Sequence, residues 1–401
     1  MRFFKDLTLG AFTAGFVAVL VGFTSSVAIV FQAALAFNAT PAQIASWMWA
    51  LGIGMGLCTV LPSLWWKKPV MVAWSTPGAA VLVTAGAAGG ISGGFSMAEA
   101  VGAFMVSAAL ITLFGATGWF EKLLSRIPVA IASALLAGVL ARFGMQGFAA
   151  AQTALPLVLL MLAVYLVGKR SVPRYAVVAT LLAGIAYVAL RGELAWSTVS
   201  FTFTLPVFVM PQFTFAASVS LGIPLFVVTM ASQNLPGVAA IRATGYEGQI
   251  PVSKVITLTG LATFVLAPFG GFALNLSAIT AAIVMGSQAH PDPDKRYTAA
   301  VSCGLIYLVI GVFGAAVTSL LAAFPKELVA AIAGLALLST IGAGLATAVQ
   351  DESHREAALI TFLVTLSGVV IAGIGSAFWG VVAGALALFV QQYGQAKAAN
   401  L

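Results

Sequence analysis

The chain contains very few charged residues. Only 7% of its 401 residues are Asp, Glu, Lys or Arg, and 61% are hydrophobic, whereas a soluble domain has about 25% charged residues. This composition excludes a soluble enzyme and predicts an all-α polytopic membrane protein. The net charge of +7 does not indicate a nucleic-acid partner, because the basic residues are scattered over short loops instead of forming one patch.

Cysteine and histidine are nearly absent, with two residues of each. Cys58 and Cys303 lie inside apolar runs and are predicted to be packing residues, so no disulfide framework is expected. His290 and His354 lie in loops. We interpret the His290 loop, which also carries two Asp residues at 292–294, as a solvated turn, with a metal centre as the alternative. The sequence therefore predicts no metal, no cofactor and no enzymatic activity, and this loop is the only candidate centre of a membrane enzyme.

Long apolar runs make up most of the chain. Charged residues and Pro/Gly breaks divide them into fourteen segments that could cross a bilayer. The segments are 9–36, 41–64, 69–89, 96–119, 127–148, 153–168, 173–190, 215–233, 252–270, 272–288, 297–322, 326–348, 356–374 and 376–395. The first is too long for a signal peptide and is predicted to be a retained span.

The distribution of basic residues favours all fourteen crossings. With the N-terminus inside, fifteen of the 18 Lys and Arg residues fall in inward loops, and only Arg191 and Lys326 fall outside. Omitting either the third or the tenth segment would destroy this bias. Both termini are therefore predicted to be cytoplasmic. Arg142 lies within the fifth segment, where we expect its long side chain to reach the outer surface.

The second half of the chain echoes the first at an offset of about 200 residues. Three pairs of motifs share this offset: residues 111–116 with 310–315, Pro128 with Pro325, and Thr76 with Ser277. Because each half holds seven segments, an odd number, the halves must have opposite orientations. We predict a 7+7 inverted repeat of residues 1–192 and 193–401.

Two segments contain a helix start in their interior. Thr76 followed by Pro77 is an N-cap followed by a residue suited to the first helical position. Ser277, just after the polar Asn275, could cap the tenth segment in the same way. A helix that begins at mid-membrane exposes unpaired N–H groups and a partial positive charge. Two such starts facing each other predict an anion site in a secondary transporter. The alternative for Thr76-Pro77 is a proline kink in a continuous helix.

The residues around these two starts are the candidate binding residues. They are Ser25, Ser26, Trp74, Ser75, Thr76, Pro77, Gly78, Gln233, Asn234, Asn275, Leu276, Ser277, Ala278 and Ser339. Gln233 and Asn234 end the eighth segment, where amides are costly unless they pair or line a cavity; capping of the helix at the inner surface is the alternative. Trp74 could pack against an aromatic substrate or serve in ordinary packing.

Acidic residues are absent from the deep part of every predicted span. Proton-coupled transporters usually keep a carboxylate or His at the site. If protons are coupled here, the substrate's own carboxyl group could carry one, or a peripheral group such as Glu99 could. Glu99 begins the fourth segment and is otherwise predicted to be an N-terminal helix charge.

Four stretches resemble the benzoate–proton symporter (BenE-type) family of bacterial inner membranes. They are AWSTPGAA at 73–80, VTMASQN at 228–234, GLALLSTIG at 334–342 and GIGSAFWG at 373–380. The likeness extends from about Gly10 to Gln391, nearly the whole chain. It implies a multi-pass inner-membrane protein that imports benzoate or a similar small aromatic carboxylate with protons. An uncoupled facilitator or channel for another small organic anion or nucleobase-like solute is the alternative, and a homodimer is left open.

The resemblance also implies a fold like that of the uracil and nucleobase transporters. In that fold segments 1–4 and 8–11 form a core domain, and segments 5–7 and 12–14 form a gate domain. Segments three and ten each pair a short strand with a half-helix, and the substrate lies between them near spans one, eight and twelve. The related nucleobase transporters carry acidic residues in spans eight and ten, where this chain has Gln233, Asn234 and Asn275. Their proton path therefore cannot be transferred to this chain, and a neutral, donor-rich site suits a carboxylate ligand.

Overall fold

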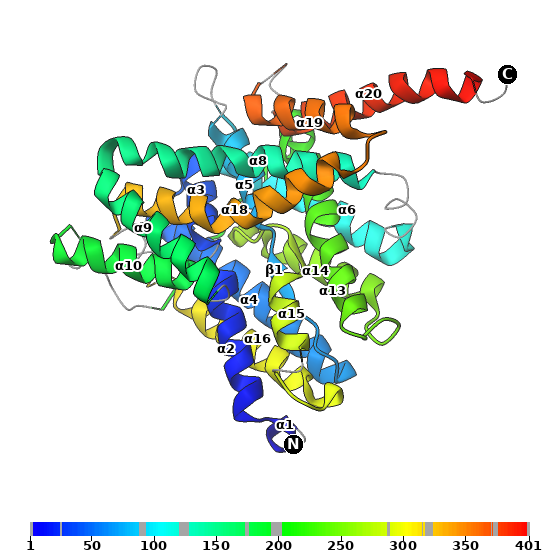
Figure 1. The fold of residues 1–401 in the computed structure, drawn as a ribbon. Coiled ribbons are helices and arrows are strands. Elements are labelled where there is room, and N and C mark those ends of the chain that lie inside the picture. The colour runs from blue at the N-terminus through cyan, green and yellow to red at the C-terminus, as the bar shows by residue number, and fades with distance from the viewer. Residues whose placement is uncertain are drawn as a thin grey trace.

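The computed structural model is built almost entirely of helices (Figure 1). It describes residues 3–24, 26–87, 94–119, 128–172, 176–193, 203–286, 289–314, 316, 324–369, 371 and 376–398. Six helices of this part are long and apolar enough to cross a membrane: Pro41–Trp66, Met97–Thr117, Ala151–Ser171, Phe215–Val238, Val252–Phe269 and Pro293–Val312. The polytopic membrane fold predicted from composition is thereby confirmed, whereas the number of crossings and the inverted repeat stay predictions.

Each of the fourteen predicted segments contains at least one helix. The first half comprises α1 (Phe3–Asp6), α2 (Leu9–Thr24), α3 (Val27–Ala36), α4 (Pro41–Trp66), β1 (Val72–Trp74), α5 (Thr76–Ala87), α6 (Met97–Thr117), α8 (Val129–Ala149), α9 (Ala151–Ser171) and α10 (Ala176–Leu190). The second comprises α11 (Phe215–Ala217), η3 (Ser218–Gly222), α12 (Ile223–Thr229), η4 (Met230–Asn234), α13 (Leu235–Ala243), α14 (Val252–Leu266), η5 (Ala267–Phe269), β2 (Leu274–Leu276), α15 (Ile279–Met285), η6 (Pro293–Lys295), α16 (Tyr297–Val312), α18 (Lys326–Gln350), α19 (Arg355–Ser367) and α20 (Ser376–Ala398).

Local sequence explains where the long helices begin. Thr40 caps α4 through a reciprocal pair of bonds with Gln43, and Pro41 occupies the first helical position. Ser96 and Glu99 form the same capping box at the start of α6. The prediction that Glu99 is an N-terminal helix charge is therefore confirmed.

The helices pack in two groups. In one, α4 lies against α16, α6 against α14, and α3 against α5. In the other, α8 packs on α18 and α19, α19 on α20, and α9 on α10; Figure 1 shows α8 and α18 side by side, with α19 and α20 beside them. Small residues allow the close approaches, because lipid provides no hydrophobic drive between helices. The two strands β1 and β2 lie within the first group, among α4, α14 and η4.

Candidate substrate site

The two interrupted segments meet directly. β1 and β2 form an antiparallel ribbon in which Ala73 lies opposite Asn275 at the centre. The ribbon is extended at both ends, where Ser75 N–H donates to the Ala273 carbonyl and Ser277 N–H to the Met71 carbonyl, each at 3.0 Å. The helices α5 and α15 then leave the ribbon from its opposite ends. Each segment is thus a short strand followed by a short helix, as predicted, and the continuous helix with a proline kink is excluded.

Side chains from neighbouring helices satisfy the outer edges of this ribbon. Thr59 Oγ1 of α4 accepts from Val72 N–H at 3.2 Å, and Thr263 Oγ1 of α14 accepts from Leu274 N–H at 3.0 Å. The edge of a two-stranded ribbon leaves backbone donors unpaired, and inside a membrane protein no bulk water replaces a missing acceptor. These threonines therefore hold the ribbon in its position between α4 and α14.

The first half-helix, α5, begins one residue earlier than its sequence predicts. We predicted Thr76 as the N-cap, but Ser75 Oγ accepts from Gly78 N–H at 3.0 Å, so Ser75 is the cap and Pro77 takes the second helical position. Thr229 Oγ1 of α12 donates to the same Ser75 oxygen at 3.1 Å and fixes its rotamer. Pro77 has no N–H, and Gly78 N–H is already bonded to Ser75. Thr76 N–H is therefore a backbone donor at this helix start that has no acceptor among the described residues.

The prediction that Ser277 caps the second half-helix is wrong. The N-cap of α15 is Ala278, which has no side-chain capping bond. Ser277 Oγ instead accepts from Thr280 Oγ1 at 2.5 Å, because the chain enters the helix one residue later than at α5. Within the described part of the chain no acceptor meets the backbone N–H groups of Ala278, Ile279 or Thr280.

Trp74 is fixed by the break in the first segment. Its indole Nε1–H donates to Ser26 Oγ at 2.8 Å, and Ser26 in turn donates to the Gly22 carbonyl at 2.8 Å. The Trp74 ring packs against Phe23 with centroids 5.4 Å apart, and Trp74 is only 4% exposed. The structure thus brings Ser26 and Trp74 together. Ser25 lies outside the described residues, as does the side chain of Ser339 in α18.

Gln233 and Asn234 have different environments although they are neighbours. Both lie in the π-helix η4, a type of distortion common at functional sites. Asn234 is fully buried, and its Oδ1 accepts from Leu276 N–H of β2 at 2.9 Å, while Nδ2 donates to Met230 Sδ at 3.2 Å. The side chain of Gln233 is half-buried and forms no hydrogen bond to another described residue. Asn234 therefore positions the ribbon, whereas the Gln233 amide is available to a ligand.

Threonine hydroxyls are the site residues that sequence reasoning missed. Thr59, Thr229, Thr263 and Thr280 all bond to the ribbon or to a half-helix start. Nothing in the sequence distinguishes them from threonines such as Thr112, which bonds back to its own helix. Their only signal is a single hydroxyl in an apolar helix, which is common in membrane proteins.

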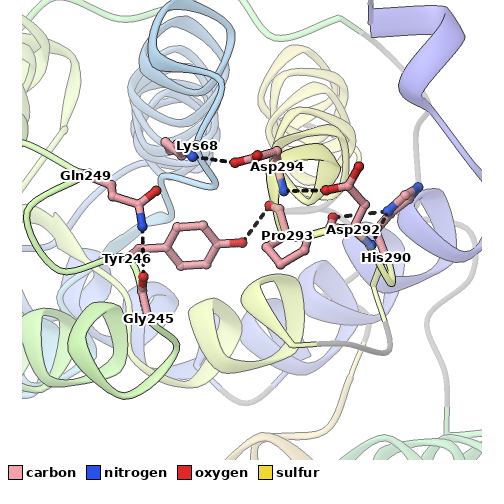
Figure 2. Close-up of polar contacts among 8 residues, drawn as sticks. All are labelled: Lys68, Gly245, Tyr246, Gln249, His290, Asp292, Pro293 and Asp294. Atoms are coloured by element: carbon pink, nitrogen blue, oxygen red, sulfur yellow. Dashed lines mark hydrogen bonds and ion pairs between the residues drawn. The ribbon is translucent and has the colours of Figure 1, made fainter.

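The loop that carries His290 is an internally bonded turn (Figure 2). Asp292 Oδ1 accepts from Asp294 N–H at 3.0 Å, and His290 Nδ1 accepts from Asp292 N–H at 2.9 Å. These polar atoms are used by the turn itself, and no group of three His, Cys, Asp or Glu residues suited to a metal occurs among the described residues.

The same loop is joined to the end of α4 and to the 245–250 turn (Figure 2). Lys68 Nζ lies 2.6 Å from Asp294 Oδ1, and Tyr246 OH donates to the Pro293 carbonyl at 2.8 Å.

The bond to Lys68 lowers the pKa of the Asp294 carboxyl. The Lys68–Asp294 ion pair therefore stabilises the fold above the ordinary Asp pKa. This stabilisation is lost as the pH falls through the lowered pKa. We expect Lys68→Met to reduce the Tm slightly at pH 7, and this difference to vanish at pH 2; a difference that persists in acid would contradict the assignment.

Two interrupted helices that meet through paired short strands inside a many-helix membrane protein are typical of secondary transporters. Solved structures share this fold: the transmembrane domain of a cyanobacterium bicarbonate transporter, BicA, aligns with a TM-score of 0.57 at 16% identity, covering 97% of each chain. SLC26A9 aligns with a TM-score of 0.57 at 11% identity, covering 95% of this chain and 65% of that chain.

The chain belongs to the family described as "Benzoate membrane transport protein", whose profile matches residues 5–390. A relative from Acinetobacter baylyi (strain ATCC 33305 / BD413 / ADP1), the "Benzoate membrane transport protein", is 39% identical over 386 residues, 96% of each chain. "Inner membrane protein YdcO" from Escherichia coli (strain K12) is 49% identical over 377 residues, 94% of each chain. The protein is therefore a multi-pass inner-membrane transporter and not an enzyme.

Proposed function

We propose that this transporter imports benzoate or a similar small aromatic carboxylate together with protons. The observation that carries the proposal is a donor-bearing centre of the molecule, where Thr76 N–H and the Gln233 amide have no acceptor among the described residues. The family supports a small carboxylate as the substrate.

The carboxyl group would bind at the start of α5, between the Thr76 N–H and the Gln233 side chain. The free N–H groups of Ala278 and the residues after it would line the second side, with Ser277 and Leu276 fixing the backbone there. A backbone donor costs no reorganisation when it binds an oxygen, and the α5 dipole adds a partial positive charge. The aromatic ring would lie against apolar neighbours of the two half-helix starts.

Transport would occur by displacement of one helix group against the other. We propose that the first group, which contains the ribbon, is the core domain (segments 1–4 and 8–11), and that the second is the gate domain (segments 5–7 and 12–14). The packing supports this division, because the helices of the second group contact one another far more than they contact the first group. The second group consists of α8, α9, α10, α18, α19 and α20. The proposal includes a 7+7 inverted repeat, with both termini cytoplasmic, and a homodimer stays open.

Replacing Gln233 tests the substrate site. We expect Gln233→Leu to lower benzoate uptake into proteoliposomes at least tenfold, because the loss of a hydrogen bond that leaves a substrate oxygen unpaired costs about 1–3 kcal/mol. Ser133→Ala, on α8 of the second group, is the control and should retain uptake. Equal loss in both variants, or none in Gln233→Leu, would contradict the assignment.

Coupling is tested separately from binding. Uptake of labelled benzoate against its gradient, collapsing on addition of a protonophore, is expected of the symporter. A facilitator or channel would only equilibrate the label, and it would be indifferent to the protonophore.

A further inference from the structure

One polar atom at the centre of the ribbon has no hydrogen-bond partner among the described residues. Asn275 is fully buried, and its Nδ2 donates to the Ala273 carbonyl at 3.1 Å, but Oδ1 accepts no hydrogen bond. Only two other buried side-chain oxygens of the described residues share this property, those of Ser107 and Thr365, and neither lies on the ribbon. A buried amide oxygen left without a donor costs about 1–3 kcal/mol, so an arrangement that keeps it unpaired points to a ligand.

The Asn275 amide is linked to the start of α5 through a shared acceptor, the Ala273 carbonyl. Because side chains alternate along a strand, Asn275 and Ala73 project from the same face of the ribbon. Ala73 is partly exposed, whereas Val72, Trp74, Leu274 and Leu276 on the opposite face are buried. Asn275 Nδ2 and Ser75 N–H also donate to one oxygen, that of Ala273, at 3.1 and 3.0 Å. The acceptor Oδ1 and the donor Thr76 N–H, one residue further on, therefore belong to one site.

We propose that the substrate occupies this site as the neutral carboxylic acid, so that the co-transported proton travels on the substrate itself. The acid O–H would donate to Asn275 Oδ1, and the acid C=O would accept from Thr76 N–H. The inference rests on the proposed function. The carboxylate takes up one proton on the outer side and releases it by dissociation inside, so that one anion and one proton cross together without net charge.

The anion fits this pair of atoms less well than the acid. A carboxylate has only acceptor oxygens, and one of them would face the lone pairs of Asn275 Oδ1. The acid offers one donor and one acceptor, which matches one acceptor and one donor on the protein. Selection of the acid by Asn275 is thus a matter of hydrogen-bond pattern, and the protein need not supply an acidic side chain.

Among the described residues, the elements packed against β2 contain no carboxylate or histidine that could carry the proton. The elements packed against it are β1, α4, α14 and η4. Among their described residues the only titratable or charged side chains are Cys58, a thiol buried in α4, and Lys254, which is exposed in the first turn of α14. Neither side chain bonds to Asn275, whose Nδ2 donates to the Ala273 carbonyl and whose Oδ1 has no partner among the described residues.

Benzamide provides a direct test, because it has the shape of benzoic acid, carries a donor and an acceptor, and cannot ionise. In wild-type proteoliposomes we expect benzamide to inhibit benzoate uptake at a concentration within tenfold of that of unlabelled benzoate at pH 5. The half-saturating concentration of total benzoate should rise about tenfold per pH unit above its pKa, as the acid form is depleted, while inhibition by benzamide stays constant.

The outcomes separate this inference from the proposed function. Absence of benzoate uptake would overturn both. Three other results would overturn the neutral-acid inference alone. They are electrogenic uptake, uptake driven by sodium, and uptake that changes neither with pH between 5 and 8 nor on addition of a hundredfold excess of benzamide.

A pair of variants assigns the effect to Asn275. We expect Asn275→Leu to raise the inhibitory concentration of benzamide at least tenfold. Thr263→Val removes the bond to Leu274 N–H in the same strand but leaves Oδ1 untouched, so it controls for loosening of the ribbon. It should keep the wild-type ratio of benzamide to benzoate inhibition. If Asn275→Leu folds and keeps the wild-type ratio of benzamide to benzoate inhibition, the inference is overturned. If this variant does not fold, the benzamide measurement on the wild-type protein decides the inference.

Discussion

Replacing Gly52 with leucine is expected to abolish the folded protein. Gly52 lies where α4 crosses α16, and a Cβ at this position would be 2.5 Å from Gly311 Cα, 2.7 Å from Gly311 N and 2.9 Å from the Tyr307 carbonyl oxygen. All three are backbone atoms, so rotation of a side chain cannot relieve the overlap. Gly56, one turn later, meets Leu308 and the Gly304 carbonyl in the same interface.

Gly52→Leu is expected to be this damaging because lipid provides no hydrophobic drive that holds two helices together. Contact between α4 and α16 depends on close backbone packing, and this is the small-residue interface of membrane helices. Overpacking costs typically 1–3 kcal/mol even where side chains can shift, and here α16 would have to move away from the helix that supports β1. We expect size-exclusion chromatography in detergent to show aggregation in place of a single peak.

Gly342 provides the matched control for this experiment. It is also a glycine inside a long apolar helix, α18, but a Cβ there would meet no atom of the described residues within 4 Å. Gly342→Leu should elute as the wild type does. If both variants elute normally, the tight α4–α16 contact is not required for folding; if both aggregate, leucine itself, and not the contact, is responsible.

The helices and their breaks could be predicted from the sequence because the bilayer constrains them strongly. A span needs about 20 apolar residues, and an interior helix start needs a capping residue; both are local features. The capping position itself could not be predicted. Ser75 and Thr76 are both good N-cap residues, and the choice between them depends on Ala273, which binds Ser75 N–H from the other half of the chain.

Contacts in the site between residues far apart in the sequence could not be predicted from local sequence patterns either. The sequence marked Gln233 and Asn234 equally, as adjacent amides in an apolar segment. Their different roles depend on the π-helix η4, which turns Asn234 toward Leu276, and on the register of β2. Neither has a sequence signature, so the residue that holds the ribbon could not be distinguished from the one that is open to a ligand.

Asn234→Leu is expected to have the second large effect. Leucine has the same branched heavy-atom shape as asparagine, although its two methyl groups are bulkier than the amide, and it cannot accept from Leu276 N–H, which would then be a buried donor without a partner. The cost is about 1–3 kcal/mol, and β2 with the start of α15 would shift. We expect a lower Tm in detergent and benzoate uptake reduced at least tenfold at equal protein amounts.

The stability measurement distinguishes a positioning role from substrate contact. Gln249→Leu is the control, because this amide donates to the Gly245 carbonyl in an exposed turn, where its loss should leave both Tm and uptake unchanged. If Asn234 instead binds the substrate directly, uptake would fall while the Tm of the ligand-free protein stays at the wild-type value. The bond of 2.9 Å to Leu276 predicts that the two fall together, since the half-helix start can present its N–H groups only when the strand before it is held in place.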